Sequence, residues 1–171
     1  FPRVTELVPL DGAAAIALGE TPLNDRSAIA SVAPLGFRNW TWALDGTSLW
    51  ACSWEDRPGA SANAAVRDTS LPPPGADRIV RLDEPFTGAP REVARAEWPV
   101  EGLAFTEDGS KLMVWEGYEP RRVERQWWID PNDPAKRTTL VRRSTEGAYD
   151  DPGGPLTREL RHQEVVRTTP D

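Results

Sequence analysis

The sequence predicts an all-β protein built from consecutive four-stranded antiparallel sheets of the β-propeller type. A hairpin pattern occurs twice, with Asp45-Gly46 and Asp108-Gly109 as its turns, and a long repeat with strand patterning is typical of propeller blades. The 17 prolines and 13 glycines interrupt the chain often, which argues against long helices. Eight tryptophans supply large apolar side chains for a core.

Residues 1–36 are expected to form a leading hairpin and loop of a partial blade. Two short strands are predicted over 3–9 and 13–18, separated by an Asp11-Gly12 turn. Residues 19–36 are small and polar, as in a loop.

A first complete blade is predicted over 37–97. Apolar residues at 40, 42 and 44 alternate with smaller ones, which indicates a strand with one apolar face. Asp45-Gly46 tolerates the positive φ of a tight hairpin, and the return strand runs over 49–54. A loop rich in proline and glycine follows over 56–76, and the last two strands are predicted over 77–83 and 91–96.

A second blade is predicted over 98–143, with strands at 103–105, 111–115, 123–130 and 137–143. The third strands of the two blades end alike, in Leu82-Asp83 and Ile129-Asp130. Four strands per unit match a propeller blade. Residues 144–171 are expected to be a tail or the start of a further blade.

Two and a half blades form an incomplete ring, because propellers usually need four to eight blades. The chain is therefore expected to be a fragment of a longer polypeptide, and self-association through its open blade edges is a further expectation. The alternative is a small sandwich of about ten strands in which Asp-Gly hairpins recur by chance.

Composition limits the function classes. The net charge of −7 repels phosphates, so no nucleic-acid partner is expected. No apolar run reaches the ~20 residues that span a bilayer, so no membrane partner is expected either. Cys52, the one cysteine, is expected to be a small buried apolar residue. No cofactor or metal site is predicted, and the sequence does not indicate a compartment.

Three stretches resemble the propeller region of the prolyl oligopeptidase (S9) family of serine peptidases, in its glutamyl endopeptidase-like branch. One is a strand and turn that ends in Glu-Pro-Phe-Thr-Gly-Ala-Pro-Arg, over 78–91. Another, over 118–131, is rich in aromatic residues and arginine and leads into Asp-Pro. The third, over 142–155, contains Tyr149 and ends in Asp-Pro-Gly-Gly-Pro. The resemblance covers roughly residues 1–160.

The resemblance implies a propeller that covers a C-terminal α/β-hydrolase domain with a Ser-Asp-His triad, restricts access to it and contributes to binding a peptide substrate. This sequence lacks the triad. Gly59-Ala-Ser61-Ala-Asn63 begins like the family's Gly-x-Ser-x-Gly motif but lacks its final glycine and lies in a predicted loop. Peptidase activity is therefore not carried over to this chain, and no catalytic residue is assigned.

Isolated polar residues have structural interpretations. His162, the one histidine, lies in a polar tail and is expected to be exposed. Asp45, Asp83, Asp108 and Asp130 stand at strand ends, where aspartate accepts hydrogen bonds from nearby backbone amides.

The tryptophans are expected to serve mainly in packing between blades. Trp40, Trp42 and Trp50 are expected to face the core, and Trp127-Trp128 to put one ring on each face of a strand.

Arg121, Arg122 and Arg125 form the densest basic cluster and are the candidate substrate-binding residues. Guanidinium groups bind carboxylates bidentately. Since the resembled branch cleaves after glutamate, an arginine that faces the propeller channel would suit an acidic side chain. The alternative is that these arginines pair with Glu119 and Glu124 in an ordinary surface cluster.

The first functional interpretation is a non-catalytic propeller segment that gates or shapes substrate access to the α/β-hydrolase catalytic domain of the same polypeptide. The second is a stand-alone propeller-like binding or scaffold module. A third, an independent small hydrolase, lacks a nucleophile–base pair in the sequence.

Overall fold

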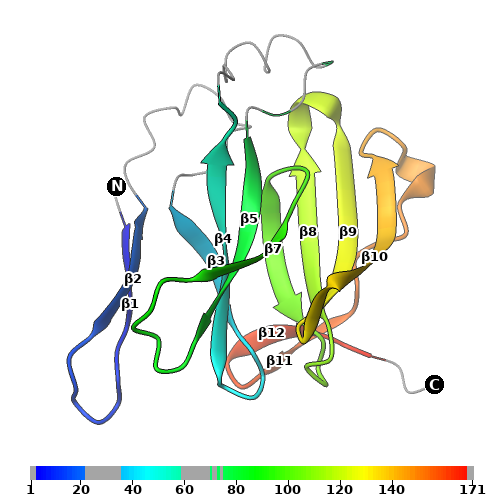
Figure 1. Cartoon of the computed structure of the whole chain (residues 1–171). Coiled ribbons are helices and arrows are strands. Elements are labelled where there is room, and N and C mark those ends of the chain that lie inside the picture. The colour runs from blue at the N-terminus through cyan, green and yellow to red at the C-terminus, as the bar shows by residue number, and fades with distance from the viewer. Residues whose placement is uncertain (1–2, 22–35, 59–69, 71–72, 74, 169–171) are drawn as a thin grey trace.

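The computed structural model describes residues 3–21, 36–58, 70, 73 and 75–168, and these form an all-β protein (Figure 1). The predicted fold class is confirmed at this level. The described strands pair antiparallel in two four-stranded sheets and two hairpins. Their place in a propeller ring stays a prediction.

The first sheet has the strand order β3-β4-β5-β6. Its strands are β3 (Phe37–Trp42), β4 (Ser48–Asp56), β5 (Gly75–Asp83) and β6 (Arg91–Arg95). Each predicted strand of this region is present, with ends that differ by a few residues.

The second sheet has the order β10-β9-β8-β7. Its strands are β7 (Val100–Phe105), β8 (Leu112–Tyr118), β9 (Val123–Asp130) and β10 (Asp133–Ser144). β7, β8 and β10 are longer than predicted, and the single-turn 3₁₀ helix η1 (Glu119–Arg121) joins β8 to β9.

Two hairpins flank the sheets. The first pairs β1 (Arg3–Leu7) with β2 (Ile16–Thr21), so the strand predicted over 13–18 begins later than expected. After a short 3₁₀ helix, η2 (Ala148–Asp150), the tail forms a second pair, β11 (Thr157–Leu160) with β12 (Gln163–Val166). Its turn residues Arg161 and His162 both have positive φ, 52° and 64°, as a type I′ hairpin requires.

The Asp-Gly turns have the predicted chemistry. Gly46 and Gly109 have φ of 76° and 71°. The side chains of Asp45 and Asp108 each accept a 2.9 Å hydrogen bond from the amide two residues later, that of Thr47 or Ser110.

Asp130 accepts a bond of the same kind from Asn132 N–H, also at 2.9 Å. At Asp83 the carboxylate pairs with the Arg81 guanidinium at 2.5 Å, and the turn hydrogen bond is made by its main-chain carbonyl, which accepts the Phe86 N–H at 2.9 Å. Arg81 is two residues before Asp83 on the same strand, so the two side chains share one face of the sheet.

One core joins the two sheets. Trp50 on β4 meets Phe105 on β7 edge to face, with ring centroids 5.9 Å apart, and Cys52 is buried among the same residues, as predicted. Trp127 lies in this core and Trp128 packs on the opposite face of its sheet, which confirms one ring per face.

Trp42 corrects the predicted core. It is 37% exposed rather than core-facing. A bulge between Arg38 and Thr41, with Asn39 at φ 55°, breaks the two-residue alternation. Thr41 therefore stands opposite the buried Trp50, and Trp42 turns to the other face.

Two buried carboxylates hold the connection between the sheets, residues 96–99. The main-chain carbonyl of Asp77 on β5 accepts the Ala96 N–H at 2.9 Å. The side-chain carboxylate of Asp77 accepts the Val100 N–H at 2.5 Å. Glu116 on β8 accepts the N–H groups of Glu97 and Trp98 at 2.7 and 2.8 Å.

An arginine neutralises each carboxylate. Arg38 pairs with Asp77, and Arg125 donates two nitrogens to the Glu116 oxygen that the amides leave free. Burial raises the pKa of both acids, and the hydrogen bonds and arginines act against that shift.

We expect the Cys52 thiol to be inert in the native protein. Burial raises its pKa to about 12, and the thiolate is the reactive form. Iodoacetamide at pH 8 should leave the folded chain unmodified and alkylate Cys52 in urea, as measured by mass spectrometry. Alkylation of the folded chain at the rate of a free thiol would contradict this burial.

We expect Glu116→Ala to lower the free energy of unfolding by about 3 kcal/mol, because it leaves the N–H groups of Glu97 and Trp98 without their acceptor and leaves the half-buried Arg125 with only its 3.6 Å contact to Glu97. Urea unfolding followed by tryptophan fluorescence measures the change. The matched control is Glu92→Ala, which removes an exposed ion pair with Arg95 and should cost less than about 1 kcal/mol. Equal losses in the two variants would show that Glu116 does not hold the connection.

Candidate functional site

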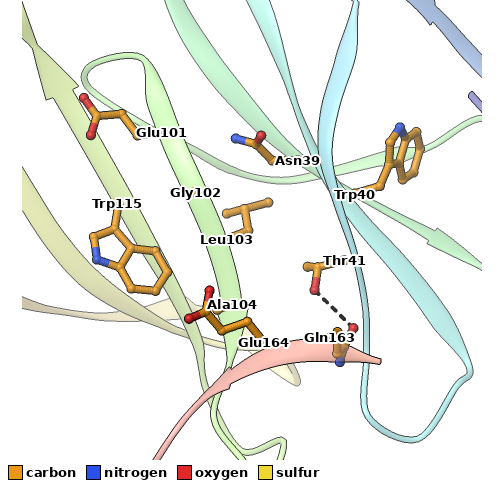
Figure 2. A pocket seen from close by; sticks show the side chains of 10 residues that line it. All are labelled: Asn39, Trp40, Thr41, Glu101, Gly102, Leu103, Ala104, Trp115, Gln163 and Glu164. Atoms are coloured by element: carbon orange, nitrogen blue, oxygen red, sulfur yellow. Dashed lines mark hydrogen bonds between the residues drawn. The ribbon is translucent and has the colours of Figure 1, made fainter. Parts of the chain in front are cut away.

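An open groove of about 480 Å³ lies between β3 and β7 (Figure 2). These are the strands that end each four-stranded sheet on the side where the two sheets adjoin. The lining residues come from β3, β7, β8 and β12: Asn39, Trp40, Thr41, Glu101, Gly102, Leu103, Ala104, Trp115, Gln163 and Glu164.

Glu101 and Trp115 give one wall of the groove its chemistry, and Figure 2 shows both side chains on that side. Partial burial raises the pKa of Glu101, and the nearby Glu124 adds to the rise. Like-charged neighbours favour the protonated form in this way. The wall therefore combines a carboxyl group with the aromatic surface of Trp115.

Asn39 belongs to the opposite wall and also to the buried joint. Its side-chain amide donates to Val100 C=O at 3.4 Å and approaches the Cys52 sulfur at 3.6 Å. The positive φ at the bulge gives Asn39 this position, since asparagine tolerates the left-handed region.

These groups can bind a ligand but do not form a catalytic set. His162 lies on the β11–β12 turn with its side chain 99% exposed, and Glu159 is 3.9 Å away. The predicted exposure of His162 is thus confirmed. Among the described residues no hydroxyl or thiol is recorded in hydrogen-bond contact with it, whereas a nucleophile needs such a base.

The structure does not bring Arg121, Arg122 and Arg125 into this groove. Arg121, on η1, donates to the carbonyl of Ser70, and Arg122 pairs with Glu146 at 3.0 Å on the surface. Arg122 thus forms a surface ion pair, but its partner is Glu146 and not the predicted Glu119 or Glu124. The substrate-binding role of the three arginines stays a prediction.

Arg125 makes contacts within the fold, with Glu116 and with two tryptophan rings. Besides Glu116, its guanidinium lies 6.0 Å from the Trp98 ring and 5.3 Å from the Trp127 ring. Arg142 covers Trp98 at 4.9 Å, and Arg137 covers Trp127 at 5.5 Å. Arginines and tryptophans thus alternate in a cation–π ladder that ties the connection at Trp98 to β9 and β10.

Glu124, the other predicted partner, pairs with Arg143 at 2.7 Å. Arg143 also reaches Asp151 at 2.9 Å, which ties β10 to the segment after η2. The carboxylates of Glu124 and Asp151 are therefore both paired with Arg143 within the fold.

A smaller cavity of about 180 Å³ lies where the two Asp-Gly turns meet. Asp45 and Asp108 both line it, but each carboxylate is occupied by its own turn. These hydrogen bonds lower the pKa of both acids. The cavity is a packing feature of the repeat.

Sequence reasoning missed the residues that organise the site: Asp77, Glu101, Glu116 and Gln163. One of them had a signal. Glu116 interrupts the apolar run Leu112–Tyr118, and a charge inside such a strand indicates a buried, paired group. Glu101 and Gln163 had none, because their role depends on which strands lie opposite.

Ser61 and the rest of the motif-like segment 59–63 fall outside the described residues, as do most of the predicted loops over 19–36 and 56–76. In the part of the chain that is described, no group of three or more His, Cys, Asp or Glu side chains is placed to hold a metal ion. The same residues include no helix with the length and apolar character to cross a membrane.

Comparison with known proteins gives one informative relative. The chain is 30% identical, over 165 residues, to a protein of Oryza sativa subsp. japonica described as "Probable glutamyl endopeptidase, chloroplastic". The alignment covers 92% of this chain and 16% of the rice protein, so the chain spans about a sixth of that relative. No family model and no solved structure matches. The chain is thus similar to one region of a protein described as a peptidase, as the sequence stretches had indicated.

Proposed function

We propose that this chain is a non-catalytic β-propeller segment of an S9-type serine peptidase. In this proposal its sheets shape or gate the access of a peptide substrate to an α/β-hydrolase domain of the same polypeptide. The observation that carries the proposal is the similarity of nearly the whole chain to one region of the rice protein.

Two structural features support it. The chain contains consecutive four-stranded antiparallel sheets, in the strand order expected of adjacent blades. The groove between their inner strands is lined with hydrogen-bonding and aromatic groups but has no nucleophile next to a base among its lining residues. Such a surface is suited to guiding a peptide, with the reaction taking place elsewhere.

The proposal is tested with the product of the complete reading frame. We expect a fluorophosphonate probe to label that product at a serine outside residues 1–171, and to leave the isolated 171-residue chain unlabelled. Mass spectrometry of the labelled peptide identifies the serine. A complete product without a labelled serine would favour the stand-alone binding or scaffold module, and labelling within the chain itself would overturn both.

Arg122 tests the predicted recognition of acidic substrates. In the complete protein, Arg122→Ala should lower kcat/KM for a glutamyl peptide about tenfold more than for its glutaminyl analogue. In this proposal the lost guanidinium binds the side-chain carboxylate of the glutamyl substrate, which the glutaminyl analogue lacks. Glu146→Ala, which removes the surface partner of Arg122, is the matched control and should leave the preference unchanged. An unchanged preference in Arg122→Ala would remove this residue from the substrate site.

A further inference from the structure

The β11–β12 hairpin belongs to neither four-stranded sheet, yet it crosses the end of the groove between them (Figures 1 and 2). Gln163 and Glu164 on β12 form this end of the lining. The hairpin touches both sheets, but the two attachments differ in kind.

The attachment to the second sheet has a buried apolar part as well as polar contacts. Its polar contacts are made to Glu107, which pairs with Arg158 at 2.7 Å and accepts the Thr168 N–H at 3.0 Å. Val166 is 3% exposed and packs with Ala104 and Met113. It forms a parallel bridge with Thr106, and its carbonyl accepts the Glu107 N–H at 2.9 Å. Burial of an aliphatic side chain stabilises such a contact, so the hairpin is firmly held at this end.

The attachment to the first sheet is polar. The Gln163 amide accepts the Trp42 N–H at 3.1 Å and donates to the Trp42 carbonyl at 3.0 Å. Arg161 donates to the Leu44 carbonyl at 2.5 Å. The apolar cluster around Val166 includes no residue of the first sheet.

The contact at Trp42 imitates strand pairing. In an antiparallel ladder the N–H and C=O of one residue point to the same side. Both Trp42 groups bind Gln163, so both point away from β4 and towards the β11–β12 hairpin. A primary amide carries both an acceptor oxygen and N–H donors, and Gln163 thus takes the place of the main chain of a neighbouring strand.

We propose that the β11–β12 hairpin is a latch that closes the end of the groove, and that the contact of the Gln163 side chain with Trp42 is its catch, the bond that holds it closed. The β11–β12 hairpin remains on the second sheet, and its release from Trp42 opens the end of the groove to an extended peptide segment. The main chain of that segment pairs with the same N–H and C=O of Trp42, as in recognition by strand addition. The inference rests on the hairpin and the groove and holds whether or not the chain belongs to a peptidase.

Hydrogen exchange measured by NMR on the full 171-residue chain tests the catch. Gln163→Ala should accelerate exchange of the Trp42 amide about tenfold, the effect of one lost hydrogen bond. Exchange of Glu107 and Ala51 should stay unchanged, since these amides report the hairpin's attachment to the second sheet and the core. The matched control is Glu159→Gln on the same hairpin, because the ion pair recorded for its side chain is with the exposed His162 and not with either four-stranded sheet.

A peptide tests the second step. The synthetic peptide of residues 160–168, added at millimolar concentration to the Gln163→Ala chain, should restore slow exchange at Trp42. The same peptide with alanine in place of its glutamine should protect Trp42 equally, because the proposed pairing uses the main chain of the peptide. Gln163→Asn, which keeps the amide but shortens its reach, replaces the alanine variant if the latter does not fold.

Three results would overturn the proposal. Unchanged Trp42 exchange in the variant would show that Gln163 is not the catch. Equal acceleration at Glu107 would show that the hairpin leaves as a whole, so that no latch exists. A failure of the peptide to protect Trp42 would remove the docking site for an extended segment.

Discussion

The structure depends on how the connection 96–99 and the first residue of β7 satisfy their N–H groups. The N–H groups of Glu97, Trp98 and Val100 are bound by the carboxylates of Glu116 and Asp77, and the Ala96 N–H is bound by the main-chain carbonyl of Asp77. Pro99 has no N–H to satisfy. A buried amide without a partner costs about as much as a lost hydrogen bond. The two carboxylates therefore allow a short connection to cross the interior, and each belongs to a different sheet.

This constraint also explains the arginines. A buried carboxylate needs a compensating charge, and Arg38 and Arg125 supply it. Arg125 in turn lies between two tryptophan rings, so charge compensation and aromatic packing are provided by the same side chain. A basic cluster that looks like a binding site in the sequence is, at this residue, part of the joint between sheets.

The joint sets the geometry of the groove. Val100, the first residue of β7, is bound to Asp77 of the first sheet and to Asn39 of β3. β3 and β7 are thus linked at one end through the joint, and at the other end through the β11–β12 hairpin. The first link is buried and charged, whereas in the second link the contact of Gln163 with Trp42 is polar and near the surface. This difference is the physical basis for assigning movement to the hairpin.

Much of the strand order could be predicted from the sequence, because it depends on local chemistry. The Asp-Gly turns require positive φ at glycine and a carboxylate near a free amide, and both requirements are visible in four residues. The limits of β9 were predicted to the residue, since Val123–Asp130 is bounded by an αL residue, Arg122, and by the Asp130 turn. Trp42 was placed wrongly because a bulge leaves no pattern in the sequence.

By itself, the sequence determined the all-β class, the repeated hairpin turns, the burial of Cys52 and the placing of Trp127 and Trp128 on opposite faces of a strand, because these follow from backbone preferences and alternation within single strands. Only the tertiary structure decided that Asp77 and Glu116 bind one connection, that Arg125 is enclosed by tryptophans, and that Gln163 reaches Trp42. These contacts join residues up to 121 positions apart. The free energy that places them comes from burial and charge pairing between sheets, which no local pattern encodes.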